Sequence, residues 1–251
     1  MAEQSRGRLV ILSGPSGVGK SPLEKAFQRF FPELSSRLQR LVLYNSRRPR
    51  PRETDGVDYH FRSREQIEAL RPNQQFVVME VRGDLQAVDI QGLSEKLASH
   101  NVLFEGNPFV GGILQTATRL SSVPKLSVYL TPLSREEITY LKRPDHSVSL
   151  PELVTDIMRR KLLRRTRKQK LELSGADLTN IEKRASSAYR ELQEAWRFDF
   201  VVPNHDGEDS EHWDAFYYPI GDARRSLNAF AALLQGQTSP DTEKWERNLL
   251  P

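Results

Sequence analysis

Apolar residues follow two alternating patterns along this chain, short continuous runs and longer stretches with helical spacing. Continuous runs predict buried strands, and apolar side chains at i, i+3, i+4 and i+7 predict amphipathic helices. We expect strands at residues 8–14, 40–45, 75–81, 101–106, 125–132 and 198–204. We expect helices at residues 21–31, 63–72, 92–100, 134–142, 178–196 and 222–234. Strands that alternate with helices predict an α/β fold in which helices flank a central, mostly parallel sheet.

One segment, residues 150–173, combines helical spacing with dense positive charge. Its apolar side chains at that spacing are Leu150, Leu153, Val154, Ile157 and Met158. Eight Lys or Arg residues follow between Arg159 and Lys170. We call residues 150–173 the basic segment and interpret it as a solvated amphipathic helix, and a helix that binds RNA or a protein is the alternative.

Two further segments lack a periodic pattern. Residues 204–214 are polar and acidic, and we call them the acidic loop. Four of its side chains are candidate metal ligands, namely His205, Asp206, Asp209 and His212, although a solvated loop is the simpler interpretation. Residues 235–251 form a tail that is either a flexible end or an arm for a partner.

Composition indicates a globular protein that handles anions. The chain has 251 residues, 37% hydrophobic and 28% charged, and no apolar run approaches the roughly 20 residues of a membrane helix. The absence of cysteine excludes disulfides and thiolate metal sites. The N-terminal apolar stretch is too short for a cleavable signal, so we expect a cytoplasmic protein without a membrane segment. A net charge of +4 suits polyanionic ligands such as nucleotides or nucleic acids.

The stretch "GPSGVGKSP", residues 14–22, is the first with recognisable chemistry, and we call it the glycine loop. Gly14, Gly19, Lys20 and Ser21 fit the pattern G-x-x-x-x-G-K-[ST], in which backbone amides wrap phosphates, the lysine neutralises them and the hydroxyl holds Mg²⁺. The expected strand before it and helix after it favour a nucleoside triphosphate site over a simple glycine-rich turn. Pro22 lacks an N–H, which predicts the loss of one amide contact to the nucleotide.

The second stretch, "SRRPRPRETDGVDYHF", covers residues 46–61. It has four arginines between positions 47 and 52, followed by Glu53 and Tyr59. An arginine fork grips phosphate through two hydrogen bonds, so the cluster suits a second substrate that carries a phosphate. A solvated basic loop or a nucleic-acid patch remains the alternative.

Together the two stretches resemble the guanylate kinase family, whose members move the γ-phosphate of ATP to GMP. The family's loop is close to GPSGVGKST and its acceptor stretch is close to TTRxxRxxExxGxxYxF. The latter is matched in register by Asn45, Ser46, Arg47, Arg50, Glu53, Gly56, Tyr59 and Phe61. Weaker similarity continues at residues 132–138, 181–192 and 198–204.

The resemblance implies the fold of a P-loop kinase with acceptor-binding and lid subdomains over residues 1–234. The core would comprise about 8–42, 98–135 and 181–234, the acceptor-binding subdomain about 43–97, and an expanded basic lid about 140–180. The tail, 235–251, lies outside this domain.

The resemblance also implies a role for individual residues, with ATP and Mg²⁺ as cofactors. The implied catalytic cations are Lys20, Arg47 and Arg184. The implied ATP-binding residues are Gly14, Ser16, Gly17, Val18, Gly19, Lys20, Ser21 and Asn204, with Ser21 also a ligand of Mg²⁺. The implied acceptor-binding residues are Arg47, Arg50, Glu53, Tyr59 and Glu80.

The chain departs from the family where the base and the lid would be. Leu43 replaces a serine, and Glu80 lies three residues nearer the following glycine than the family's glutamate. Gln86-Ala87-Val88 replaces YGT or YGS. Glu105-Gly106-Asn107 replaces an Asp-Ile-Asp segment. The short arginine lid RLxxRGTE is also missing, so Lys142, Arg143 or arginines of the basic segment are candidates to supply its charge.

We therefore expect an ATP-dependent kinase of a nucleoside monophosphate, most simply GMP. A kinase of a phosphorylated sugar such as ribose bisphosphate, and a catalytically silent guanylate-kinase-like binding module, are the alternatives. We expect a monomer or homodimer that binds neither nucleic acid nor membranes.

Overall fold

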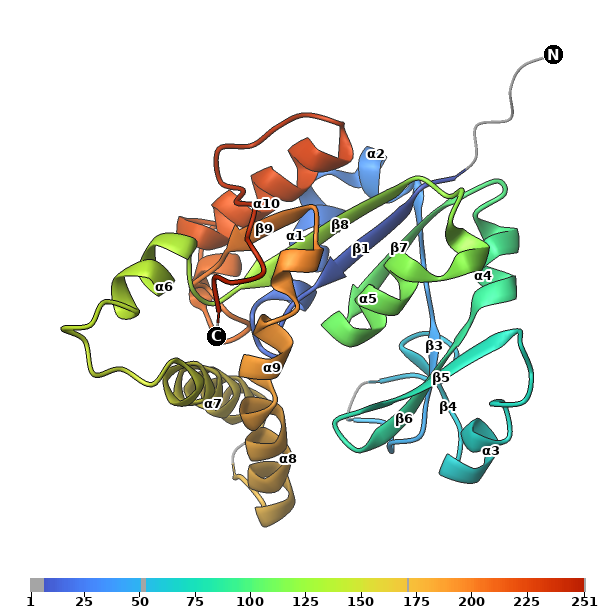
Figure 1. Ribbon diagram of the computed structural model, residues 1–251, viewed down its shortest axis with the longest axis horizontal. Coiled ribbons are helices and arrows are strands. Elements are labelled where there is room, and N and C mark those ends of the chain that lie inside the picture. Colours follow the sequence, from blue (N-terminus) through green and yellow to red (C-terminus); the bar gives the residue numbers. More distant parts are fainter. Residues whose placement is uncertain (1–6, 51–52, 171, 251) are drawn as a thin grey trace.

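The computed structural model describes residues 7–50, 53–170 and 172–250. Its central sheet has five strands in the order β2-β7-β1-β8-β9, and every pair in it is parallel. The strands are β1 (Leu9–Ser13), β2 (Leu38–Arg40), β7 (Asn101–Gly106), β8 (Lys125–Thr131) and β9 (Phe200–Pro203). The α/β class with a parallel central sheet is thereby confirmed (Figure 1).

Helices cover both faces of this sheet. α1 (Lys20–Phe30) and α10 (Gly221–Leu234) pack against each other on one face, and α5 (Pro108–Thr116) lies on the other. Gly111 lets α5 approach closely, because a Cβ there would lie 2.7 Å from Ser13 Oγ. Further short helices are α2 (Pro32–Ser35), α4 (Ile90–Lys96), α6 (Arg135–Leu141) and α9 (Ala188–Leu192), with 3-10 turns at 118–120, 195–197 and 211–213.

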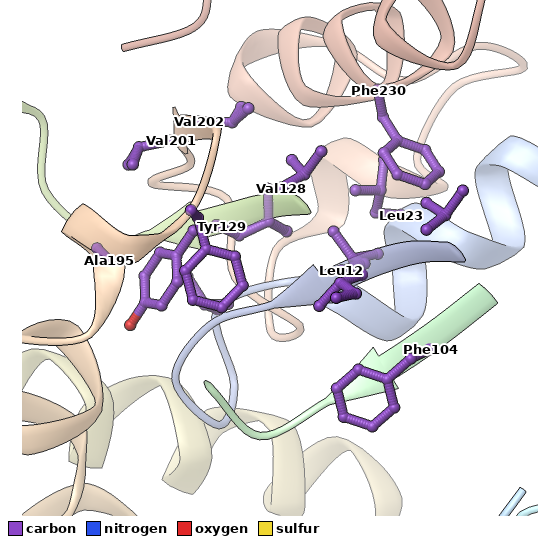
Figure 2. Close-up of a cluster of buried hydrophobic side chains, with 14 of the residues drawn as sticks. Leu12, Leu23, Phe104, Val128, Tyr129, Ala195, Val201, Val202 and Phe230 are labelled. Atoms are coloured by element: carbon purple, nitrogen blue, oxygen red, sulfur yellow. The ribbon is translucent and has the colours of Figure 1, made fainter. Parts of the chain in front are cut away.

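The core lies between these layers and is continuous. Figure 2 shows Leu12 of β1 in the middle of the cluster, with Leu23 of α1 and Phe230 of α10 close to each other and Phe104 of β7 nearby. All four side chains are at most 1% exposed. Burial of such apolar surface, at about 25 cal/mol per Å², is the main force that fixes the central sheet and its helices.

A smaller mixed sheet stands beside the central one. Its strands are β3 (Leu43–Asn45), β4 (Tyr59–Phe61), β5 (Phe76–Val81) and β6 (Asp84–Asp89), in the order β4-β3-β6-β5, and α3 (Arg64–Glu68) packs on β6. β5 and β6 form a hairpin whose two loop residues, Arg82 (φ 55°) and Gly83 (φ 83°), both have positive φ. Two-residue hairpins favour this geometry because it matches the strand twist. All four strands lie within residues 43–97.

The basic segment forms a long helix, α7 (Leu150–Gln169), and α8 (Gly175–Ser186) lies beside it. The helix was predicted, and its stripe of buried side chains consists of Leu150, Val154, Met158 and Leu162. Figure 1 shows the α7–α8 pair and the smaller sheet on the same side of the molecule, with the central sheet above both.

The tail packs back onto the core, so neither alternative predicted for it describes residues 235–250. Glu243 exchanges two backbone hydrogen bonds with Val201 of β9, at 2.7 and 2.8 Å. Trp245 is 3% exposed, and Lys244 donates to the carbonyl of Phe198 at 2.6 Å.

The pattern did not predict β2, β4, β6, α2 or α5, and it merged α8 and α9 into one helix at 178–196. In the three described stretches, no helix is both long and apolar enough to cross a bilayer.

Candidate active site

A charged cavity of about 440 Å³ lies where the glycine loop, the smaller sheet and the α7–α8 pair meet. Among the described residues, nine Lys or Arg side chains and six carboxylates line it. A second cavity of about 360 Å³ continues between residues 46–61, which we call the acceptor stretch, and α7–α8. It shares Arg50, Arg165 and Arg184 with the first. The excess of positive charge suits a ligand with several phosphate groups.

The glycine loop turns sharply between β1 and α1. Gly14, Gly17 and Gly19 have φ of 148°, 89° and 112°, conformations that other residues rarely adopt. Lys20 Nζ donates to the carbonyl oxygens of Gly14 at 2.8 Å and Pro15 at 2.9 Å. Burial lowers the pKa of the Lys20 ammonium from its ordinary value, and nearby carboxylates oppose the shift. The lysine is therefore held at the mouth of the loop, inside the cavity.

The acceptor stretch is organised by Glu53. Its carboxylate accepts two hydrogen bonds from the Arg47 guanidinium, at 2.6 and 2.7 Å, and one from the Arg50 backbone N–H at 2.7 Å. The Arg47 guanidinium carbon also lies 5.1 Å from the centre of the Tyr59 ring. Burial would raise the pKa of Glu53, but the bonds from Arg47 and Arg50 lower it below its ordinary value. The structure thus brings these four predicted acceptor residues together, while Arg52 lies outside the described residues.

Arg184 joins the glycine loop to the acceptor side. Its Nε donates to Ser16 Oγ at 2.7 Å, and its side chain is 7% exposed. Burial lowers the pKa of Arg184 well below its ordinary value, and the positive charges of Arg50 and Arg165 add to the shift. Arg184 therefore lies between the predicted donor and acceptor regions, in a crowd of cations that favours a bound anion.

The amphipathic helix predicted for the basic segment is present as α7, but part of its basic face contacts the acidic loop, so neither segment is fully solvated. Arg165 pairs with Glu208 at 2.6 Å, Arg164 pairs with Asp209 at 3.4 Å, and Lys168 donates to the Asp209 carbonyl at 2.7 Å. Glu208 and Asp209 have side chains only 9% and 7% exposed. These ion pairs and the hydrogen bond join α7 to the acidic loop beside the glycine loop.

The histidines of the acidic loop pair with carboxylates and do not gather around a common point. His205 lies between Asp222 and Glu137, and His212 pairs with Asp206. No group of three potential ligands that could hold a metal occurs in the part of the chain that the structure describes. Burial lowers the pKa of His205, but its two carboxylate partners outweigh burial and raise it.

Comparisons with known proteins show the family to which this chain belongs. The sequence profile of the family described as guanylate kinase matches residues 6–84. A guanylate kinase of Chlorobaculum tepidum is 32% identical over 212 residues, which cover 82% of this chain and 89% of that protein. The chain belongs to the guanylate kinase family. The family's members are phosphotransferases, and this chain is a nucleotide kinase of that kind.

Other members of the guanylate kinase family support the same assignment. A guanylate kinase of Bartonella quintana is 29% identical over 231 residues, covering 91% of this chain and 88% of that protein. The crystal structure of guanylate kinase from Anaplasma phagocytophilum covers 92% of this chain and 86% of its own, with a TM-score of 0.54 and 18% identity. At that identity the structural match supports the fold alone.

One predicted acceptor residue faces away from the guanylate kinase cavity. The Glu80 side chain is 58% exposed, pairs with Arg64 at 3.4 Å and does not line the cavity. The family's glutamate would stand at Val77, and an odd displacement along a strand moves a side chain to the opposite face. The prediction for Glu80 as an acceptor contact is therefore wrong in this structure.

Asn204 is placed beneath the glycine loop and does not line the cavity. It is fully buried, and its Nδ2 donates to the carbonyls of Val18 at 2.7 Å and Asp206 at 2.9 Å. A Cβ on Gly19 would lie 2.4 Å from that nitrogen. The side chain braces the loop, so the expected contact with ATP is corrected to a supporting role.

The other predicted ATP residues divide into two groups. Gly14, Ser16, Lys20 and Ser21 line the cavity. Gly17, Val18 and Gly19 do not, because α7 and Asn204 cover that side of the loop. A Cβ on Gly17 would lie only 3.0 Å from Leu162 Cδ2 of α7.

Sequence reasoning missed several residues of the site. Arg82 and Glu191 form a bidentate ion pair at 2.6 and 2.7 Å that joins the smaller sheet to α9. Arg165 and Glu208 were not singled out, and no local signal links residues 43 positions apart. Glu105 also lines the cavity, and the signal for it was an acidic residue at the end of a buried strand next to β1.

Lys142 and Arg143, the other candidates for the lid charge, lie elsewhere. Lys142 donates to the Leu249 carbonyl at 2.8 Å, and the Arg143 guanidinium lies over the Tyr140 ring. Neither lines the cavity. Among the arginines of the basic segment, Arg165 lines the cavity.

Proposed function

We propose that this member of the guanylate kinase family transfers the γ-phosphoryl group of ATP to a nucleoside monophosphate, with GMP as the first expected acceptor. The observation that carries the proposal is the meeting of Lys20, Arg184 and the Arg47–Glu53–Tyr59 cluster in one cavity. The family's named members support GMP as the acceptor.

The proposed chemistry needs positioning and charge neutralisation more than proton transfer. An oxygen of the acceptor phosphate attacks the γ-phosphorus, the bond to the β-phosphate oxygen breaks, and ADP leaves with a nucleoside diphosphate formed. Arg47, Arg50 and Tyr59 would hold the acceptor phosphate. Lys20 and Arg184 would stabilise charge on the transferring group.

Ser21 and Glu105 fit a magnesium ion in this proposal. Both line the cavity, and hydroxyl and carboxylate oxygens are hard ligands of the kind that Mg²⁺ prefers. When bound, the ion would neutralise part of the charge on the nucleotide phosphates. Burial raises the pKa of Glu105 and Lys20 opposes the shift, so a bound cation would favour its ionised form.

A phosphorylated sugar is the second candidate acceptor. Leu43 is 4% exposed and offers no hydrogen bond where the family has a serine, and Glu80 faces outward. Asn45 and Gln86 are the buried amide side chains that line this part of the cavity. The phosphate-gripping cluster is retained, so an acceptor with a phosphate but without a purine ring also suits the site.

The test is a coupled assay of ADP formation with a panel of acceptors. The panel contains GMP, dGMP, AMP, CMP, UMP and ribose 1,5-bisphosphate, each with Mg²⁺ and ATP. We expect GMP to stimulate ADP formation at least 100-fold over the rate without acceptor.

The matched control is Lys20→Ala, which we expect to reduce kcat by at least 100-fold because the group that stabilises the transferring phosphoryl is removed. Stimulation by ribose 1,5-bisphosphate alone would favour the sugar kinase. No stimulation by any acceptor, together with no measurable ATP binding, would favour the silent module.

A further inference from the structure

The acidic loop places a carboxylate beside the glycine loop. The Glu208 N–H donates to the Gly17 carbonyl at 3.0 Å, so the two loops are in direct contact. Gly207 permits this approach, because a Cβ there would lie 2.6 Å from the same carbonyl oxygen. The Glu208 side chain lines the same cavity as Lys20 and Arg184.

Arg165 meets this carboxylate from the other side. Its Nη1 lies 2.6 Å from Glu208 Oε2, and its side chain is 24% exposed. Thr166, the next residue of α7, lines only the second cavity, whereas Arg165 lines both. The helix itself is anchored on the glycine loop through Leu162.

The charges around Glu208 are those that a nucleotide phosphate would require. Burial raises the pKa of the carboxyl, but Arg165, Lys20 and Arg184 outweigh burial and lower it. These cations are themselves partly or fully buried, so each gains from a neighbouring anion. Glu208 supplies that anion from within the chain.

We propose that Glu208 is an internal substitute for a nucleotide phosphate, and that Arg165 exchanges Glu208 for the phosphates of ATP. In this exchange the Arg165–Glu208 ion pair breaks and the guanidinium forms hydrogen bonds to phosphate oxygens. The Glu208 side chain is released toward solvent, while Asn204 stays beneath the glycine loop. Arg165 then acts as a catalytic residue carried by the inserted helix α7. The identity of the nucleotide rests on the proposed function.

The exchange predicts opposite effects for the two partners on ATP affinity. Calorimetric titration of the full-length chain with Mg²⁺ and ATP compares the wild type, Glu208→Gln and Arg165→Gln. We expect Glu208→Gln to bind about tenfold more tightly, because the competing charge is gone. We expect Arg165→Gln to bind at least tenfold more weakly. Unchanged or weaker binding by Glu208→Gln would overturn the proposal, and Glu208→Ala provides the same test if the glutamine variant does not fold.

Arg167→Gln is the matched control. Arg167 lies two residues further along α7 and is exposed, and within the described stretches it has no ion pair. It carries the same charge as Arg165, so a general electrostatic effect of the basic helix would reduce affinity in both variants. We expect the affinity of Arg167→Gln to stay within twofold of the wild type.

A double variant tests whether the two residues act on each other. In an Arg165→Gln background, we expect Glu208→Gln to improve ATP binding by less than threefold. If Glu208→Gln improves ATP affinity tenfold in both backgrounds, then Glu208 competes with ATP only for Lys20 and Arg184. That result would overturn the proposed exchange at Arg165.

Activity adds a readout that a structural role would not give. We expect Arg165→Gln to reduce kcat at least 30-fold at saturating ATP, with partial rescue by Arg165→Lys. These binding results do not depend on the acceptor. If no acceptor supports ADP formation but the order of ATP affinities is as expected, the proposed function fails and the exchange stands. If ADP forms normally but Glu208→Gln binds ATP like the wild type, the proposed function stands and the exchange fails.

Discussion

The substitution Arg82→Met tests the ion pair that joins the smaller sheet to the core. Glu191 is 0% exposed and accepts two hydrogen bonds from Arg82, one from Ser187 Oγ at 2.9 Å and one from Asn107 Nδ2 at 3.0 Å. Methionine fills similar volume but supplies neither donor, so the substitution leaves a buried carboxylate with two of its four hydrogen bonds.

The structure gives the size of the expected loss. A hydrogen bond to a charged group contributes about 1.5–3 kcal/mol, and breaking one side of a buried ion pair costs about 3–5 kcal/mol. We therefore expect the free energy of unfolding to fall by about 3–5 kcal/mol, a large part of the usual total of about 5–15 kcal/mol.

Urea unfolding followed by circular dichroism measures this loss. Arg64→Met is the matched control, because Arg64 of α3 pairs with Glu80 of β5 but both side chains are more than half exposed. An exposed pair contributes at most about 1 kcal/mol. The double substitution Arg82→Met with Glu191→Met should recover most of the stability, because no unpaired charge then remains buried. A loss below about 1 kcal/mol for Arg82→Met alone would refute this account of the pair.

Three further predictions concern the glycine loop and its support. Pro22→Thr restores an N–H in the first turn of α1, so calorimetry should show ATP binding that is unchanged or up to about fivefold tighter, and markedly weaker binding would contradict this. Asn204→Ala removes the amide that donates hydrogen bonds to two buried carbonyl oxygens. It should lower the free energy of unfolding by about 2–4 kcal/mol in urea titrations, whereas an unchanged value would mean that water replaces the amide. Because the pKa of His205 is raised in the folded state, its stabilising effect is complete below the unfolded pKa and is lost as pH rises through the folded one. The difference in Tm between the wild type and His205→Gln should therefore shrink by about 1–2 °C between pH 6 and pH 9 in differential scanning calorimetry, and a growing difference would reverse the sign of this argument.

Four strands of the central sheet could be predicted because they are largely buried, whereas β2, which is mostly exposed, could not. Residues 9–13 are an unbroken apolar run apart from Ser13, and such runs are typical of parallel sheets. β6 escaped detection because Asp84 and Asp89 bound a short segment whose polar Gln86 faces the cavity. α5 escaped because its two glycines lower helix propensity, although Gly111 is needed for close contact with β1.

The candidate site was predictable where a local motif specifies it. The spacing of Lys20 and Ser21 behind the glycines, and of Arg47 before Glu53, depends on a few consecutive residues. The Arg165–Glu208 and Arg82–Glu191 pairs depend on how distant segments pack, which no spacing encodes. The roles that the resemblance implied for Glu80 and Asn204 were wrong. Glu80 lies on the outer face of its strand, and Asn204 is fully buried.

The tail has a consequence for the behaviour of the protein in solution. β9 is an edge strand of the central sheet, and edge strands with free N–H and C=O groups are templates for pairing with other chains. The two hydrogen bonds between Glu243 and Val201 occupy part of that edge, and Trp245 covers adjoining apolar surface. A chain shortened at Gln235 would expose both, and its main defect would be aggregation through the uncovered strand.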